Sequence, residues 1–423
     1  MFSIFIKKIK LVFKDKNLSK RIFFVLGALL VFRLLAAIPI PGIDSNALSN
    51  FFNNSQLLGL INISSGGGLS SFSIIMLGVS PYITASIIMQ VATMISPRLK
   101  SMYHEEGQIG RKKFSQYSRL LTIPLAVVQG FSFMVLLQQQ SVIAPMGMAL
   151  MMTNILIITA GSMLLMWIGE MISEFGIGNG ISLIIFAGIV AGLPGAIQNI
   201  IFTYDASQLP TLIAFALVGI AIVTGVVIVS EAERSIPITY SNQARGGSSK
   251  GVSTYLPLKL NQAGVIPIIF AISILTLPNI VVGLLSNVGN LTVQSVAGNI
   301  NAFMANQFNY GLLYFILVFL LTYFYTAVTF DPDNTAENLQ KSGAFIPGVR
   351  PGEQTAKYIG NVVTRITLVG ALFLGSVAIL PIIVQSISGI TSITIGGTAL
   401  LIAVSVAIDL VKKIDAQVSM REY

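Results

Sequence analysis

Long apolar segments alternate with short polar ones along the whole chain. Ten of the apolar segments each come close to the roughly 20 residues that an α-helix needs to cross the hydrocarbon core of a bilayer. The pattern therefore predicts an all-α polytopic membrane protein with ten transmembrane helices. The apolar runs cover residues 22–40, 74–95, 119–139, 149–172, 180–202, 211–230, 262–285, 311–330, 360–385 and 391–411.

The second run follows an unusual apolar segment. Residues 59–73 are rich in Gly and Ser and carry no charge, and Gly66, Gly67 and Gly68 favour a mobile backbone. Irregular backbone at membrane depth is tolerated only where it is buried in protein or lines a watery cavity. The segment favours a cavity that holds a small movable element; an outside loop followed by an ordinary helix is the alternative.

The 25 Lys and Arg residues mark one side of the predicted membrane region. Apart from Arg33, they precede the first run or lie in or next to the loops after the second, sixth, eighth and tenth runs. The positive-inside rule then puts both termini in the cytoplasm. Loop 173–179 has no basic residue, so its side follows from its neighbours. The alternate loops hold no Lys or Arg: 41–73, 140–148, 203–210, 286–310 and 386–390.

Ten spans divide into two halves of five, residues 22–202 and 203–411. Because five is odd, the halves have opposite orientation, an arrangement that often encloses a cavity. Residues 1–21 spread basic residues among apolar ones and predict an amphipathic helix on the cytoplasmic membrane surface instead of a cleaved signal peptide. Residues 412–423 are predicted to form a cytoplasmic tail.

Composition agrees with a membrane protein. Hydrophobic residues make up 54% of the 423 positions and charged residues 10%, whereas a soluble protein has roughly a quarter charged residues. Cysteine is absent, which excludes disulfides, thiol nucleophiles and Cys-ligated metals.

Three loops on the predicted cytoplasmic side are long: residues 96–119, 231–261 and 331–359. In the second, Ile236, Ile238 and Tyr240 alternate with polar residues before the stretch QARGGSSKG, and apolar residues at 252, 255 and 256 follow it. This pattern predicts a protruding β-hairpin. The length of loops 231–261 and 331–359 favours docking of a cytosolic partner. Charged residues in such loops are, however, most often solvated and reflect only the side of the membrane on which the loop lies.

The residues that intramembrane enzymes need are missing. The only histidine is His104, in a loop, and no phosphate-binding G-x-x-x-x-G-K-[ST] motif occurs. Glu170 and Asp409 lie at predicted cytoplasmic helix ends, where solvation or pairing with Lys412 or Lys413 is expected. We therefore expect no enzyme activity, no cofactor and no metal. A passive conduit fits better than an ion-coupled transporter, which uses intramembrane carboxylates or histidines.

Arg33 lies inside the first run, where an unpaired charge costs about 2.5–3.5 kcal/mol on insertion scales. Two interpretations stay open. Arg33 is either a charge along a pore or ion pathway, or a structural residue that bonds backbone carbonyls or reaches the outer interface.

Aliphatic residues repeat at helical spacing in two places. Val79, Ile83 and Ile87 share one helix face, and Ile181 and Ile185 repeat the pattern after GIGNG. Such residues usually face lipid or pack inside a bundle. The alternative is a constriction of branched side chains around a pore, which excludes water and ions by dewetting.

Several long stretches resemble the SecY family, the central subunit of the bacterial protein-conducting channel, over nearly the whole chain. The matching stretches are VFRLLAAIPIPGID (31–44), SSGGGLSSFSI with LGVSPYITASIIMQ (64–90), EEGQIGRKKFSQYSR (105–119), WIGEMISEFGIGNGISLIIFAGIVAGLP (167–194), LPLKLNQAGVIPIIFA (256–271) and SGAFIPGVRPGEQTAKYI (342–359).

The resemblance implies a channel that moves unfolded polypeptides across the bacterial cytoplasmic membrane and releases hydrophobic segments sideways into the bilayer. It implies an hourglass pore with a half-length plug helix at about 60–72. The plug would include Ser64, Ser65, Gly66, Gly67, Gly68 and Leu69, and the pore ring would consist of Val79, Ile83, Ile181, Ile185, Ile269 and Ile402.

The same resemblance implies a lateral gate near Thr84, Gln90, Asn261 and Leu277. Docking residues would be Arg245, Lys250 and Arg350 in the two long loops. The implied partners are the membrane subunits SecE and SecG, the SecA ATPase, the ribosome, signal sequences with their unfolded preproteins, and anionic lipids.

Two positions depart from the family pattern. The loop tip QARGGSSKG has fewer basic residues than the family usually shows, and we therefore expect it to bind ribosomal RNA phosphates more weakly. Val79 stands where the ring usually has isoleucine, a change that trims volume and preserves an apolar seal.

Overall fold

A computed structural model of the protein describes residues 15–41, 72–139, 143, 146–202, 209–240, 254–285, 291–388 and 391–419. Nearly all of its regular structure is helical. The helices are α2 (Lys16–Ala36), α5 (Ser80–Ile95), α6 (Pro97–His104), α7 (Gly107–Gln139), α8 (Met148–Phe175), α9 (Gly180–Phe202), α10 (Leu209–Glu231), α12 (Ile266–Leu285), α13 (Leu291–Ala305), α14 (Gln307–Thr329), α15 (Pro332–Lys341), α16 (Glu353–Ser388) and α17 (Thr391–Ser419).

Each of the ten predicted apolar runs overlaps one of these helices over most of its length. Within the described residues, four helical stretches are long and apolar enough to cross a membrane, namely 107–138, 148–175, 307–341 and 353–383. Shorter apolar helices cover 80–95, 180–195, 216–231 and 266–275. The helical fold class is thus confirmed, whereas ten crossings in two inverted halves stay a prediction.

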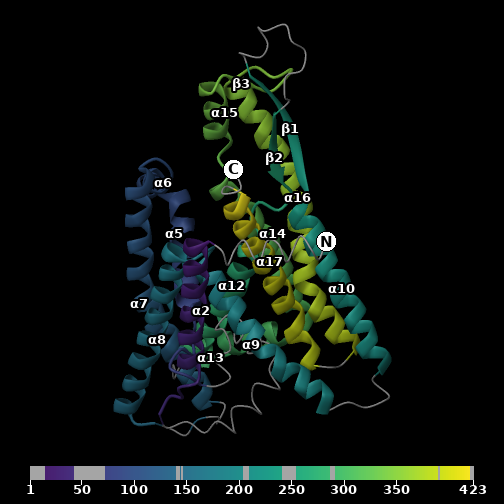
Figure 1. Ribbon diagram of the computed structural model, residues 1–423. Coiled ribbons are helices and arrows are strands. Elements are labelled where there is room, and N and C mark those ends of the chain that lie inside the picture. The colour runs from purple at the N-terminus through teal and green to yellow at the C-terminus, as the bar shows by residue number, and fades with distance from the viewer. Residues whose placement is uncertain are drawn as a thin grey trace.

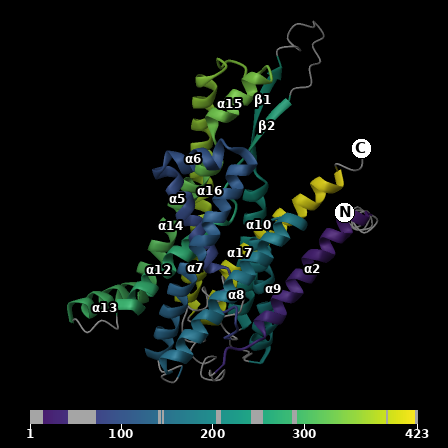
Figure 2. The same cartoon turned by 90° about the vertical axis from the view of Figure 1, so that its left-hand side faces the viewer.

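The helices form two groups that stand side by side (Figure 1). One group holds α2 and α5 to α8, and the other holds α10, α14, α16 and α17. Helices α9 and α12 contact both groups: α9 packs on α8 and α17, and α12 packs on α5, α7 and α14. A view from the side shows α13 projecting from the end of the bundle opposite the sheet (Figure 2).

Several boundaries differ from the sequence expectation. Helix α5 begins at Ser80, because residues 74–79 form a series of turns in which Gly78 has φ of 57°. Helices α6 and α13 lie in segments expected to be loops. Residues 16–21 belong to α2 and not to a separate surface helix, and α17 continues through most of the expected tail, to Ser419.

The predicted hairpin is present at one end of the molecule. Strands β1 (Glu233–Tyr240) and β2 (Thr254–Lys259) pair antiparallel, with Ile236 opposite Leu256, and β3 (Ala344–Phe345) extends the sheet in the order β2-β1-β3. One face of this sheet packs on α16 through a small apolar cluster that includes Ile236, Leu258 and Ile359. The hairpin is therefore anchored to a long helix of the bundle.

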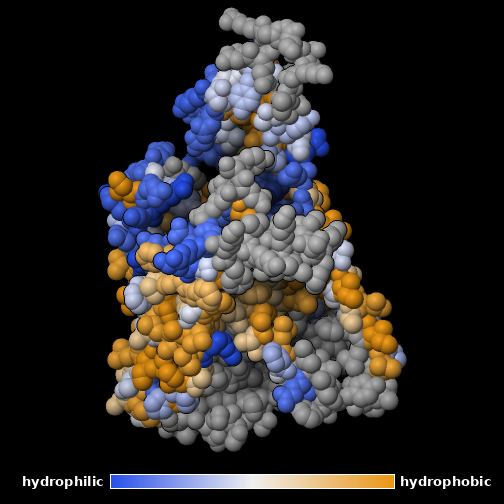
Figure 3. Space-filling view, in the orientation of Figure 1, coloured by the Kyte–Doolittle hydropathy of each residue, from blue (hydrophilic) through white to orange (hydrophobic). Residues whose placement is uncertain are grey.

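The surface separates by polarity along the long axis. On the face shown in Figure 3, hydrophobic residues predominate over the lower helices, and hydrophilic residues predominate at the end that carries the sheet, α15 and α6 (Figures 1 and 3). Basic residues in α6, at the start of α7 and in β2 thus gather at this end. This distribution is typical of a protein that sits across a bilayer.

Replacing Ile236 by Ala tests how the sheet is anchored. The side chain is 2% exposed, so the substitution should cost about 2–5 kcal/mol of local stability by leaving a cavity. We expect faster trypsin cleavage after Arg234 and Lys259 in membranes. Tyr255→Ala, which changes an exposed residue of the same sheet, is the control, and equal cleavage rates for both variants would contradict the anchoring.

Candidate functional site

Six aliphatic residues come from four separate parts of the bundle. Val79 precedes α5 and Ile83 lies in its first turn, Ile181 and Ile185 begin α9, Ile269 lies in α12 and Ile402 in α17. All of them belong to or pack against the largest apolar cluster. Five are between 1% and 6% exposed, and Ile181 is half-buried. They do not face the outer surface, so the lipid-facing interpretation does not hold for these residues.

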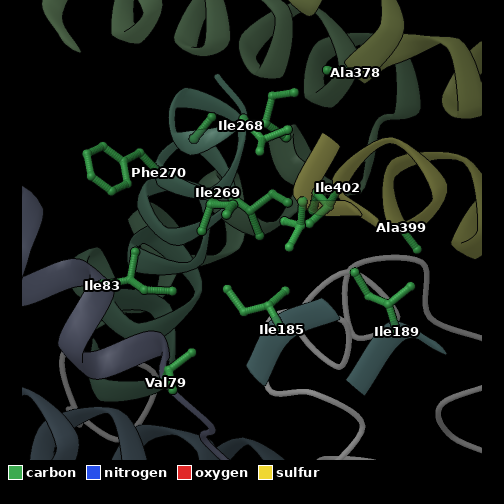
Figure 4. Packing of buried hydrophobic residues seen from close by; sticks show 14 of the residues in the cluster. Val79, Ile83, Ile185, Ile189, Ile268, Ile269, Phe270, Ala378, Ala399 and Ile402 are labelled. Atoms are coloured by element: carbon green, nitrogen blue, oxygen red, sulfur yellow. The ribbon is translucent and has the colours of Figure 1, made fainter. Parts of the chain in front are cut away.

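Four of these side chains converge in space. Figure 4 shows Ile83 and Ile185 pointing toward each other, with Ile269 beside them and Ile402 directed toward Ile269. Of the helices that carry them, α5 belongs to one group and α17 to the other, and α9 and α12 contact both groups. The contact therefore lies where the two groups meet.

A cavity of about 840 Å³ lies against this cluster. Its polar wall comes from α5, α7, α8 and the start of α9, and its apolar wall includes Ile83, Ile181, Ile185 and Ile269. The polar lining residues are Ser86, Gln90, Gln108, Arg111, Lys112, Ser115, Gln116, Arg119, Glu170, Ser173, Glu174, Asn179 and Ser182.

The order of residues along α5 and α9 shows that Ile83 and Ile185 lie at the floor of the cavity. Along α5, the lining changes from Gln90 through Ser86 to Ile83 with increasing distance from the sheet end. Along α9 it changes from Asn179 to Ile185 in the same direction. The site is thus a polar vestibule that narrows onto branched aliphatic side chains.

The start of α9 is fixed locally. The Asn179 carboxamide oxygen accepts hydrogen bonds from the backbone N–H groups of Ile181 and Ser182 at 3.0 and 3.3 Å. This satisfies amide donors that the first helical turn leaves without intrahelical partners. Ile181 therefore sits at the first ordered turn of α9, next to the vestibule.

An ion pair joins α7 and α8 in the wall of the vestibule. Arg119 Nε of α7 lies 2.6 Å from Glu170 Oε1 of α8. The pairing expected for Glu170 and Asp409 is confirmed for Asp409, whose carboxylate lies 2.7 Å from Lys413 Nζ one helical turn away. It is wrong for Glu170, which pairs with Arg119 instead of Lys412 or Lys413. Sequence spacing does not reveal the Arg119 contact, because 51 residues separate the partners.

Arg33 does not line the vestibule. It lies exposed in the last turn of α2, three residues from the helix end. This position agrees with the structural alternative, in which a long basic side chain reaches toward the membrane interface.

Known proteins resemble this chain over nearly its whole length. The family profile named SecY matches residues 73–411. The protein translocase subunit SecY of Mycobacterium bovis is 39% identical over 445 aligned residues, which cover 100% of this chain and 99% of that protein. The subunit of the same name from Thermotoga maritima is 41% identical over 424 residues, covering 97% and 95%.

The chain belongs to the SecY family. Solved structures with lower sequence identity to this chain have the same fold. One described as the structure of a protein conducting channel has a TM-score of 0.64 and 19% identity, over 93% of this chain and 91% of that chain. The Sec61 chain of a canine ribosome-channel complex from the endoplasmic reticulum has a TM-score of 0.61 and 17% identity, with the same coverage.

The lateral gate expected for a SecY-family member involves α5 and α12, which pack together. Thr84 is buried, and its hydroxyl donates to the Ser80 carbonyl at 3.0 Å. Gln90 lines the vestibule, whereas Asn261 lines a second cavity of about 320 Å³. Leu277 lies in α12, but its side chain is outside the described residues. The gate assignment stays a prediction.

The remaining SecY-family expectations are only partly covered. The plug residues Ser64 to Leu69, and Arg245 and Lys250 at the hairpin tip, lie outside the described residues. Arg350 is exposed between β3 and α16, and its carbonyl accepts a 2.8 Å hydrogen bond from the Thr355 hydroxyl. This bond ties the Arg350 loop to the first turn of α16.

Cysteine accessibility tests the vestibule, because the natural chain has no cysteine. We expect Ser86→Cys and Ser182→Cys to react with a membrane-impermeant maleimide added from the sheet side, since both serines line the cavity. Ser162→Cys is the control, because Ser162 in α8 is 1% exposed and should react much more slowly. Equal reaction rates at Ser162 and Ser182 would contradict an open vestibule.

Proposed function

We propose that this protein is a protein-conducting channel, which moves unfolded polypeptides across a membrane through the vestibule and the aliphatic ring. One observation carries the proposal: branched aliphatic residues of α5, α9 and α12 form the floor of a polar cavity, and Ile402 of α17 packs in the same apolar cluster. Membership of a family whose curated relatives are named protein translocase subunit SecY supports it.

The aliphatic side chains of the ring suit a seal that has to open for polypeptides of any sequence. The proposed ring consists of Val79, Ile83, Ile181, Ile185, Ile269 and Ile402. A constriction lined by alkyl groups repels water and ions by dewetting. Alkyl side chains also part without breaking hydrogen bonds, so that a passing chain meets little sequence-specific resistance.

Sideways release into lipid is proposed to occur between α5 and α12. Helix α5 belongs to one group of the bundle, and α12, which contacts both groups, packs directly on it. An apolar substrate segment that separates them gains contact with acyl chains, because hydrocarbon is the favourable environment for its side chains. Thr84, Gln90, Asn261 and Leu277 are the proposed gate residues.

The proposed plug is the segment at about 60–72. A related solved structure, with a TM-score of 0.63, is described as showing that the plug domain of the SecY protein stabilises the closed state and maintains a membrane seal. Residues 64–69 of this chain are proposed to act in the same way, on the side of the ring opposite the vestibule.

The sheet end is proposed to face the cytoplasm of a bacterium, with both termini on that side of the cytoplasmic membrane. The proposed docking residues there are Arg245, Lys250 and Arg350. Ribosome-bound relatives include the canine Sec61 complex and the yeast Ssh1 complex bound to the 80S ribosome. We propose that the ribosome and the SecA ATPase dock at this end, that SecE and SecG bind within the membrane, and that anionic lipids contact the basic residues.

Crosslinking to an arrested export substrate tests the ring directly. With single cysteines at Ile83 and Ile269, we expect disulfide or maleimide crosslinks to a polypeptide stalled during active export. The matched control is a cysteine at Leu217 of α10, which is exposed on the outer surface. Crosslinks at Leu217 but at neither ring position would overturn the proposed path.

A further inference from the structure

Helix α8 touches the backbone of another segment at Gly161. A Cβ atom added there would overlap the Ile74 carbonyl oxygen, and it would lie 2.8 Å from the Ile74 carbonyl carbon and 3.3 Å from the Ile75 nitrogen. Backbone atoms cannot rotate away as a flexible side chain can. Any residue larger than glycine must therefore displace residues 72–79 or α8 itself.

Residues 72–79 make bridge and turn hydrogen bonds in place of a regular helical ladder. Ile40 N–H donates to the Phe72 carbonyl and Ile74 N–H to the Ile38 carbonyl, at 2.9 and 3.0 Å. Short turns follow, as in the 2.8 Å bond from Gly78 N–H to the Ile75 carbonyl. This buried segment leads directly into Val79 and Ile83, so its position against α8 determines where these two ring residues lie.

A second contact of the same kind lies further along α8. A Cβ atom at Gly180, the first residue of α9, would overlap the Gly169 carbonyl oxygen and approach Ile172 Cβ to 2.8 Å. Gly180 N–H also donates to the Ser173 hydroxyl at 2.8 Å. Helix α9 thus starts in backbone contact with α8, and Ile181 follows immediately.

Gly169 also makes room for a ring side chain itself. A Cβ atom there would lie 2.6 Å from Ile181 Cδ1 and 3.3 Å from Ile184 Cδ1. The absence of a side chain at Gly169 is therefore what lets Ile181 occupy its observed place beside the vestibule floor.

We propose that Gly161, Gly169 and Gly180 are positioning residues for the pore ring, with α8 as the rigid support against which both ring-bearing segments are set. The inference rests on the proposed function of the ring. Four of the six ring residues lie within a segment held in this way or within about one helical turn after it, namely Val79, Ile83, Ile181 and Ile185. A methyl group at any of the three glycines shifts ring side chains and opens the closed seal.

The test measures ion conductance of the assembled channel in planar lipid bilayers without substrate. We expect a several-fold gain of conductance for Gly161→Ala and Gly180→Ala at normal abundance in the membrane. The control is Gly192→Ala in α9, where an added Cβ meets nothing within 4 Å. A merely structural role predicts reduced abundance without a gain of conductance, and that result would overturn the inference.

A pair of substitutions keeps the test decisive if Gly161→Ala does not fold. Gly169→Ala should conduct ions, and adding Ile181→Val should reduce that leak, because valine lacks the Cδ1 atom that the new methyl group meets. Failure of the second substitution to reduce the leak would contradict the contact as its cause.

An Ile83→Ser variant separates this inference from the proposed function. If Ile83→Ser conducts ions while Gly161→Ala and Gly169→Ala behave like Gly192→Ala, the ring is a seal and only the positioning role fails. If Ile83→Ser does not conduct even after deletion of the proposed plug segment, residues 60–72, the ring is not the seal and both proposals fail.

Discussion

Exclusion of water from a narrow apolar constriction is the interaction on which the proposed channel depends. An ion that enters such a constriction loses its hydration shell and finds no polar group to replace it, so the charge is repelled without any charged gate. In the described structure, Ile side chains of α5, α9 and α12 lie at the floor of a vestibule lined by amides, hydroxyls and an ion pair, and Val79 and Ile402 belong to the same apolar cluster.

The same constraint explains why the ring needs a rigid support. Aliphatic side chains seal only when they meet within van der Waals distance, and a gap below one ångström already forfeits part of the contact. Residues 72–79 are a chain of turns, and α9 starts at Gly180 after a short connection, so the position of each segment relative to α8 depends on tertiary contacts. Backbone contact at the α8 glycines supplies the position that local structure does not.

Some of this arrangement is readable from the sequence and some is not. The apolar runs predict the helices because bilayer thickness imposes a length, and the alternation at Ile236 and Ile238 predicts the hairpin because strands have a period of two. The Asp409–Lys413 pair follows from helical spacing. By contrast, hydrophobicity does not distinguish a buried turn from a helix, so the start of α5 at Ser80 was not predicted. The Arg119–Glu170 pair and the Gly161 contact depend on tertiary packing, which no local pattern encodes.

The most direct measurement is high-resolution imaging of the assembled channel with a polypeptide arrested in transit. We predict that the polypeptide runs from the vestibule between Ile83, Ile185, Ile269 and Ile402, with these side chains parted around it and still in contact with it. A polypeptide that passes outside this ring, while the same four side chains stay closed on each other, would contradict the account.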